Sequence, residues 1–208
     1  MTAPSVITAP DNCAASVIMT LRRVVGATAS PFTLEEQRFK WPGEQWSIDF
    51  RLPPFTTRDV FAEWQAFMLR LEGTFNIFLM GDPSAKTPRG VATGTPQIDG
   101  NNQVGNTLLT KGWTNSVTGI LKKGDYIQIG TGALARLHMV VEDANSNGSG
   151  VAALSICPAL RYSPTNNGAI VVNDAKGAFR LSDNETSWSV DPGPVYRMSF
   201  NAIEVMNA

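Results

Sequence analysis

His138 is the residue whose type best suits general acid–base chemistry, and it is the single histidine among the 208 residues. It lies in the apolar segment 136–141, and its even spacing from Glu142 puts both polar side chains on one face of an expected strand. Catalysis by histidine needs a nucleophile or an orienting carboxylate beside it, and no serine or cysteine can be placed there from the sequence. We interpret His138 as a solvated or hydrogen-bonded strand histidine, and we predict no catalytic residue.

Paired carboxylates are the other chemistry to test, because glycosidases use two. Adjacency in sequence does not place two carboxylates roughly 5–10 Å apart across a cleft, so it predicts no such site. Residues 142–148 begin like a calcium loop, but they lack the alternate acids and the terminal Glu of an EF-hand, and a turn at a strand end is favoured. The sequence also lacks the Gly-x-Ser-x-Gly, Walker, HExxH and GxGxxG motifs, so we predict no enzyme. The carboxylate pairs considered are Glu35 with Glu36, Glu142 with Asp143, and Asp183 with Glu185.

Cys13 and Cys157 are far apart and form no CxxC pair. With one histidine, the usual zinc ligand sets cannot be assembled from this chain. We expect two free thiols, and we predict neither a metal nor a cofactor.

The five tryptophans could stack on sugars or pack against protein. Trp64 belongs to the apolar stripe of a predicted helix and is expected in the core. We favour packing or subunit contact over carbohydrate for the other four, because tryptophan is enriched where interfaces bind most tightly. These possible interface residues are Trp41, Trp46, Trp113 and Trp188.

The charge balance excludes some partners. With 17 basic and 18 acidic residues the net charge is −1, which does not suit a broad nucleic-acid or anionic-membrane surface. No segment approaches the ~20 apolar residues that span a bilayer, and the N-terminal residues lack the features of a signal peptide. We expect a protein made in the cytoplasm that contacts other proteins.

The pattern predicts a mainly β fold with one helix. Residues 16–25 and 45–52 alternate as strands, and 35–41 is expected to pair with 45–52 around a turn at Pro42-Gly43, after another turn at 26–32. The helix is expected over 58–72, with Thr57 as N-cap and Gly73 beyond its end. Its apolar residues recur at helical spacing and should pack on a sheet. They are Val60, Phe61, Trp64, Phe67, Met68 and Leu71.

Residues 84–177 differ from their flanks, because short strands alternate there with turns rich in Gly, Asn, Thr and Pro. This pattern is typical of a small barrel or sandwich. A strong strand over 195–205 then closes the chain. We therefore predict one β-sandwich domain from 1–83 plus 178–208, interrupted by an inserted barrel-like module over 84–177.

Several segments resemble the distal tail proteins of long-tailed, non-contractile bacteriophages and prophages. They are residues 46–54, the helix 59–73 and the strand 74–83, followed in the same order by Pro88–Gly90, Lys123–Gly130, Val141–Asp143, Pro158–Arg161 and Lys176–Leu181. The resemblance implies a belt domain, a β-sandwich with one helix, that assembles as a hexameric ring at the tail tip of the virion. The ring would join the tail tube protein to the hub and tape measure proteins, and the inserted module would point outward, where tail fibres are one partner to consider.

Other readings remain open at this point. A carbohydrate- or receptor-binding module at a virion tip would expose Trp113 or Trp188 along a groove. A hydrolase would need carboxylates converging in a cleft. A component of a contractile tail or secretion machine would share the ring symmetry.

Overall fold

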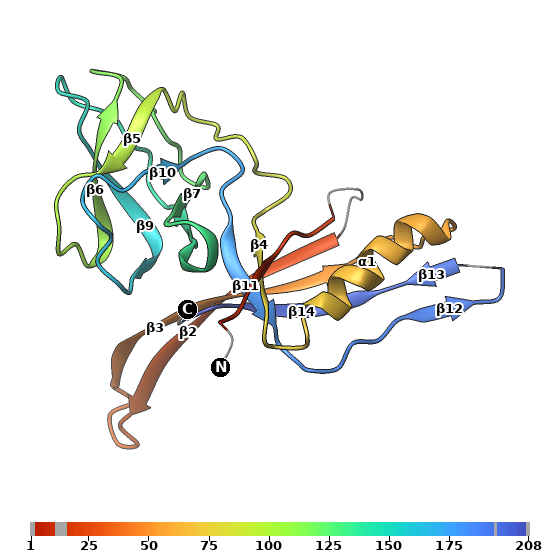
Figure 1. The fold of residues 1–208 in the computed structure, drawn as a ribbon. Coiled ribbons are helices and arrows are strands. Elements are labelled where there is room, and N and C mark those ends of the chain that lie inside the picture. Colours follow the sequence, from red (N-terminus) through yellow and green to blue (C-terminus); the bar gives the residue numbers. More distant parts are fainter. Residues whose placement is uncertain (1–2, 11–15, 194, 207–208) are drawn as a thin grey trace.

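A computed structural model of the chain describes residues 3–10, 16–193 and 195–206. The fold is mainly β with one α-helix, as the sequence predicts. Figure 1 shows three parts: a barrel-like sheet, a central sheet beside the helix, and a long hairpin that projects from the central sheet.

The central sheet takes its strands from both ends of the described chain. Its order is β1-β4-β11-β14-β3-β2, and every neighbouring pair is antiparallel except the parallel pair β1 and β4. The last strand, β14, lies between β11 and β3, so the chain returns to the middle of the first sheet after building the barrel. The bounds are β1 Val6–Ile7, β2 Ser16–Ala29, β3 Glu36–Arg51, β4 Ile77–Met80, β11 Gly177–Leu181 and β14 Ser199–Glu204.

The helix α1 spans Arg58–Arg70, which confirms the predicted helix. It follows Pro53-Pro54, which cannot continue a strand ladder, and its buried stripe packs against the aromatic face of the central sheet. The predicted side-chain cap is absent, since Thr57 occupies the N-cap position without a side-chain hydrogen bond. Gly73 has φ +66°, and a Cβ there would lie 2.7 Å from Asn184 Oδ1, so glycine suits both the conformation and the space.

Strand β3 corrects the predicted turn at Pro42-Gly43. The strand runs unbroken from Glu36 to Arg51, and its register with β2 shifts between Arg23 and Val25. Proline has no N–H to donate to the ladder, and a bulge accommodates it without reversing the chain. The chain reverses earlier in the sequence, over 30–35, between the end of β2 and the start of β3. Residues 26–29 of the predicted first turn belong to β2.

The second sheet has the order β10-β7-β8-β9-β6-β5, and a bridge between Gln97 and Ala169 brings its two ends together. It is therefore a nearly closed barrel with its own apolar core, which holds buried residues such as Ile127 and Leu154. The bounds are β5 Gly94–Ile98, β6 Gly105–Trp113, β7 Tyr126–Ile129, the 3-10 turn η1 Gly132–Leu134, β8 Arg136–Val140, β9 Ala152–Leu160 and β10 Ile170–Val171.

The final segment forms a separate hairpin before it joins the central sheet. Strands β12 Ser189–Asp191 and β13 Val195–Arg197 pair with each other, so the single strand predicted over 195–205 is divided at Met198. Tyr196 of this hairpin stacks on Phe61 of α1 at 4.8 Å between ring centroids. The hairpin thus adds to the cover of the helix, as Figure 1 shows.

Helix packing should dominate the stability of the central sheet. Phe67 is 3% exposed, and its ring lies 5.8 Å from Trp64 and 5.6 Å from Phe78 of β4. We expect Phe67→Ala to lower the free energy of unfolding by about 3–5 kcal/mol, because it removes a buried ring and leaves a cavity. Urea denaturation followed by tryptophan fluorescence measures this change.

The matched control is Leu69→Ala on the same helix, since Leu69 is 60% exposed. Its effect should stay within about 0.5 kcal/mol. Equal losses for the two variants would contradict the assigned packing face.

Candidate functional site

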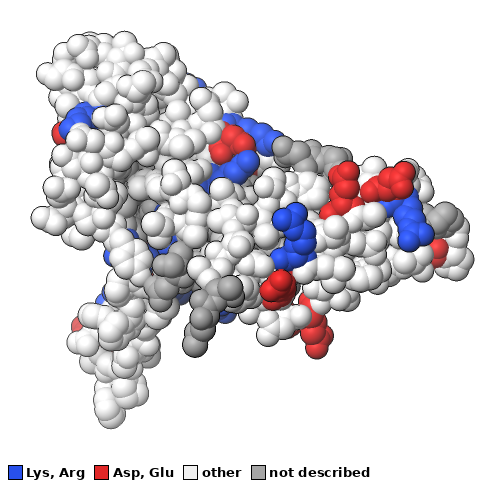
Figure 2. Space-filling model, viewed as in Figure 1, with Lys and Arg blue, Asp and Glu red and all other residues white. Residues whose placement is uncertain are grey.

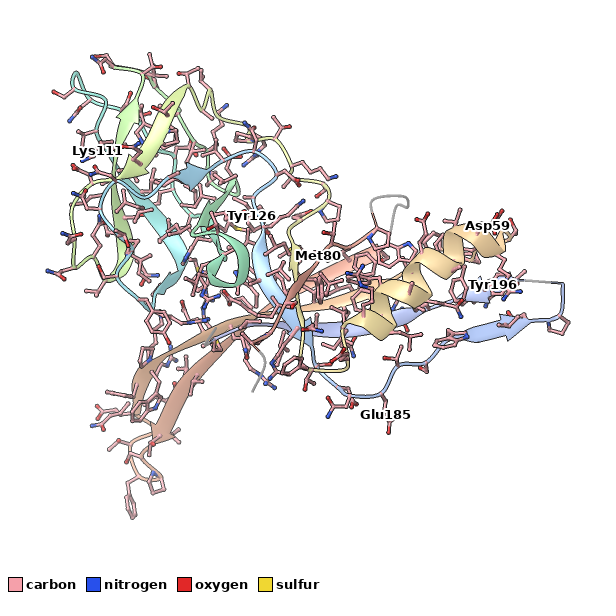
Figure 3. All side chains as sticks on the ribbon, viewed as in Figure 1. Asp59, Met80, Lys111, Tyr126, Glu185 and Tyr196 are labelled. Carbon is pink, nitrogen blue, oxygen red and sulfur yellow. The ribbon has the colours of Figure 1, made fainter. Side chains whose placement is uncertain are left out.

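Trp46 forms the centre of the contact between the two sheets. It is 5% exposed, and its indole Nε1 donates to the main-chain oxygen of Leu137 in the barrel at 3.0 Å. Its ring lies 6.5 Å from that of Tyr126, which Figure 3 labels on the barrel near the central sheet. Since Trp46 and Phe50 lie on the same face of β3, the barrel covers one end of this face and α1 covers the other.

Glu44 extends this contact as a buried carboxylate. Its side chain is 2% exposed, and its oxygens accept from Arg23 Nε at 3.1 Å, from Lys40 Nζ at 3.1 Å and from the Ala159 N–H of the barrel at 2.8 Å. Burial raises the pKa of Glu44, but the hydrogen bonds from Ala159, Lys40 and Arg23 outweigh it and hold the pKa below its ordinary value. An ionised Glu44 therefore joins the central sheet to the barrel.

Glu204 makes the corresponding contact from strand β14. Its carboxylate accepts from the Trp46 main-chain N–H at 3.2 Å and pairs with Arg161 Nη2 of the barrel at 3.3 Å. Burial raises the pKa of Glu204, and Arg161 and Arg136 offset part of this effect. We call the contacts of Glu44, Trp46 and Glu204 with the barrel the joint.

Asp125 fixes the chain where it enters the barrel. Its carboxylate is 3% exposed and accepts from the N–H groups of Arg89 at 2.9 Å, Gly90 at 3.1 Å and Lys122 at 2.8 Å. The segments Pro88–Gly90 and Lys123–Gly130, which support the family resemblance, thus contact each other. A second such link is the Lys176 N–H, which donates to Gln128 Oε1 at 2.9 Å.

His138 is buried and hydrogen-bonded, which agrees with one of the two predicted alternatives and not with a solvated side chain. Its ring is 5% exposed, and Nδ1 lies 2.8 Å from the carbonyl oxygen of Pro158, which can only accept. The pKa of His138 is lowered to about 4, chiefly by burial and also by Arg161 and Arg136, although the contact with Pro158 acts in the opposite direction. At neutral pH the ring is uncharged and carries its proton on Nδ1.

The largest exposed feature is the outer half of the β2–β3 hairpin, residues 24–42, which we call the arm. In β3, residues 44–50 alternate between buried and partly buried, whereas every residue from 36 to 42 is exposed. In β2, residues 22–29 are exposed without alternation. The five paired residues of β2 in the arm, 25–29, extend about 17 Å beyond the joint, since a strand rises about 3.3 Å per residue. Figure 1 shows the arm projecting alone from the central sheet.

The arm carries apolar side chains that no described residue of the chain covers. Phe32 is 94% exposed, and Leu34 is 81% exposed at the tip. Phe39 and Trp41 are 60% and 54% exposed, and their rings contact edge to face at 4.7 Å. A hairpin of two strands is marginally stable alone in water, and a cluster of exposed apolar side chains marks a contact surface. The geometry therefore suits binding to another protein.

The four predicted interface tryptophans divide into two classes. Trp41 lies on the arm, and Trp188, just before β12, is 40% exposed. Trp46 is part of the joint, and Trp113 is 3% exposed with its Nε1 donating to Thr110 Oγ1 at 2.8 Å. Because they are buried, Trp46 and Trp113 pack within the chain. Trp113 therefore does not line an exposed sugar-binding groove.

The carboxylate pairs considered from the sequence lie on three different parts of the fold. Glu35 and Glu36 lie on the arm, Glu142 and Asp143 follow β8, and Asp183 and Glu185 follow β11. The Glu142 carboxylate accepts from Ser155 Oγ at 2.8 Å, and Asp143 accepts from the Lys123 N–H at 2.9 Å, as expected of a turn at a strand end. Among the described residues, no three His, Cys, Asp or Glu side chains gather in a group that could hold a metal ion.

Cys157 is a free thiol at the edge of the joint, with its Sγ 2.9 Å from Arg23 Nη2. Cys13 lies outside the described residues. The thiol and Glu44 both raise the pKa of the Arg23 guanidinium, and the hydrogen bond with Cys157 is the larger cause.

Sequence reasoning missed the arm and the joint. Phe32, Leu34 and Phe39 were not singled out, and the alternation of Phe39 and Trp41 with polar neighbours is the pattern of a strand with one buried face, although all of 36–42 is exposed. Glu44 and Glu204 had no local signal, because each is buried by residues more than a hundred positions away.

Figure 2 shows few charged side chains on the visible face of the barrel, whereas most of the visible charge lies toward the end that carries the helix. The arm carries both signs of charge, on Glu35, Glu36, Arg38 and Lys40. Within the described part of the chain, no helix has the length and apolar character needed to cross a bilayer. A scan against protein-family models gave no match, and a search of curated proteins gave no match either.

Acid should weaken the region around His138. Because its folded pKa lies below the ordinary value of 6.5, the unfolded chain takes up a proton before the folded chain does as the pH falls from 6.5 to about 4. The contribution of His138 to stability is thus present above pH 6.5 and is lost toward pH 4. We expect this group alone to cost about 2 kcal/mol of unfolding free energy between pH 7 and pH 5.

The measurement is urea denaturation at both pH values, in the wild-type chain and in His138→Asn. Asparagine Nδ2 can donate to the Pro158 carbonyl as Nδ1 does, but it does not titrate. The variant should lose correspondingly less stability on acidification. An identical pH dependence in the two proteins would show that His138 is not the responsible group.

Proposed function

We propose that the chain is a structural subunit of a bacteriophage tail tip that assembles into a hexameric ring, as the resemblance to distal tail proteins implies, and that it catalyses no reaction. The ring joins the tail tube to the hub and receptor-binding apparatus of the virion. The observation that carries the proposal is the arm, whose apolar side chains are exposed in the single chain. Burial against a neighbouring copy removes this surface from water and stabilises the hairpin.

The edges of the central sheet also support a ring. Its outer strands differ, since β1 has two residues and β2 has fourteen, and each presents main-chain groups on a free edge. Two unlike flanks join head to tail in a heterologous contact, and such contacts form a closed ring when the rotation between copies is a whole fraction of a turn. The proposal therefore uses both flanks of one sheet.

The joint explains how a ring subunit carries its second module. Because Trp46, Glu44 and Glu204 contact the barrel through buried hydrogen bonds, the barrel is held against the sheet rather than tethered by a linker. In the proposed ring the barrel takes the outward position, where it is available to fibres or other tail-tip components. The arm and the barrel thus serve different contacts.

The oligomeric state tests the proposal directly. Mass photometry of the purified chain at several concentrations should show a discrete species at six times 22.4 kDa. The species should grow with concentration at the expense of the monomer, because assembly follows mass action. A monomer at every concentration would contradict self-assembly by this chain alone.

Charged substitutions on the arm should abolish the ring without unfolding the subunit. We expect Phe32→Asp combined with Trp41→Asp to yield folded monomers that melt at the temperature of the wild-type chain diluted to its monomer, because both side chains are more than half exposed in the single chain. Size-exclusion chromatography and thermal denaturation measure the two properties.

The matched control is Val104→Asp, which adds the same charge at a position of the barrel region that is 73% exposed. This variant should keep the wild-type oligomeric state. If the control disrupts the ring as strongly as the arm variant does, the arm is not the specific contact.

A further inference from the structure

A cavity of about 570 Å³ opens at one end of the barrel, beside the last strand of the central sheet. Its size falls in the range of small-molecule sites, roughly 300–1,000 Å³. The barrel contributes the end of β7, the start of β8 and the segment Pro158–Thr165, while β14 contributes Glu204. None of these residues belongs to the arm, so the cavity is independent of the proposed ring contact.

The walls of the cavity are mostly apolar. Ile98, Ile129 and Leu160 of the barrel face it, together with Leu134 of η1 and the ring of Pro164. Such walls favour the apolar body of a ligand, since burying hydrocarbon surface stabilises a complex by roughly 25 cal/mol per Å².

Two guanidinium groups and one carboxylate line the same cavity. Arg161 is 15% exposed and pairs through Nη2 with Glu204 at 3.3 Å. Arg136 forms no ion pair within the described residues, and its Nη atoms donate to main-chain oxygens of Ala133, Ala135 and Met206 at 3.3–3.4 Å. Two guanidinium groups thus face one carboxylate, and His138 is uncharged, so the lining has an excess of positive charge.

One donor of this cluster is also unused. Arg161 Nε is buried and has no hydrogen-bond acceptor among the described residues. Leaving a buried donor of a charged group unsatisfied is costly, so the Arg161 guanidinium is not fully satisfied by the described residues. The charge excess and the unused donor both lie beside apolar walls.

We propose that this cavity binds a small amphipathic monocarboxylate, with the carboxylate at Arg161 and Arg136 and the apolar body against Ile98, Ile129 and Leu160. A carboxylate matches the planar guanidinium and neutralises one positive charge. A phosphate dianion would exceed the available charge and would be repelled by Glu204. The same ligand chemistry is present in a medium-chain fatty acid and in the C-terminal residue of an extended peptide.

Isothermal titration calorimetry with matched probes tests the site. Octanoate should bind the full chain at least about tenfold more tightly than octanol, because only octanoate provides an acceptor for the guanidinium groups. Arg161→Gln should reduce the affinity for octanoate to that for octanol. Two outcomes would overturn a fatty acid as the ligand: equal binding of octanoate and octanol by the wild-type chain, or no binding of either. The proposal would then depend on the peptide acid described below.

A second pair of variants keeps the test valid if Arg161→Gln does not fold. Leu134 lines the cavity but is 60% exposed, so a charge there should not unfold the chain. Leu134→Glu should weaken octanoate binding several-fold, and Leu134→Lys should strengthen it. The control Leu109→Glu, at a site on β6 that is 46% exposed and does not line the cavity, should have no effect. Changes in the same direction for the two Leu134 variants would contradict a carboxylate at this site.

The source of the ligand is distinguished by acetyl-leucyl-leucine and its C-terminal amide. Tighter binding of the peptide acid than of octanoate would assign the site to a peptide C-terminus, whereas the reverse order would assign it to a fatty acid. Equal binding of the peptide acid and its amide, together with no preference for octanoate over octanol, would overturn the proposal.

Discussion

The structure depends on one contact, in which the barrel covers the Glu44–Trp46 end of the aromatic face of β3. Trp46 fills this contact with an apolar ring and still satisfies its N–H at the Leu137 carbonyl. Glu44 and Glu204 bring two carboxylates into the same region, and each is compensated by guanidinium, ammonium or main-chain donors. Buried charges of this kind add little net stability compared with apolar packing, but they tolerate few alternative arrangements. The position of the barrel on the sheet follows from that constraint.

The same strand connects this contact to the two other parts of the molecule. Toward its C-terminal end, β3 places Ile48 and Phe50 against α1 and completes the apolar core. Toward its N-terminal end, beyond the bulge opposite Val24, it leaves the body and forms half of the arm. Because Pro42 cannot donate to the ladder, the interruption lies at the boundary between the buried and exposed halves. One strand thus contributes to core, joint and contact surface.

Two charged residues near the joint, Arg161 and Glu204, also line the cavity. Arg161 holds Glu204 and leaves its own Nε without an acceptor among the described residues, while Arg136 remains bound only to main-chain oxygens. His138 is kept neutral by burial in the same region, and the two arginines add to that effect. The barrel is therefore attached by a cluster that is not fully neutralised, next to apolar walls. Binding at this place would not require the arm, so the proposed assembly and the proposed ligand binding use separate parts of the fold.

The sequence by itself determined the elements whose signal is local. The stripe from Phe61 to Leu71 predicted α1, alternation predicted a strand over 45–52, and dense turn signals predicted a barrel-like sheet. Strand β5 was missed, because Gly94 and Pro96 weaken its pattern, and Pro42-Gly43 was taken for a reversal, because a bulge and a turn share the same residue types. Only the tertiary structure decided that Trp46 and Trp113 are buried and that Glu44 and Glu204 join two sheets. It also decided that the apolar side chains of the arm are exposed among the described residues. The physical reason is that burial and charge compensation depend on partners distant in sequence, which periodicity over a few residues does not contain.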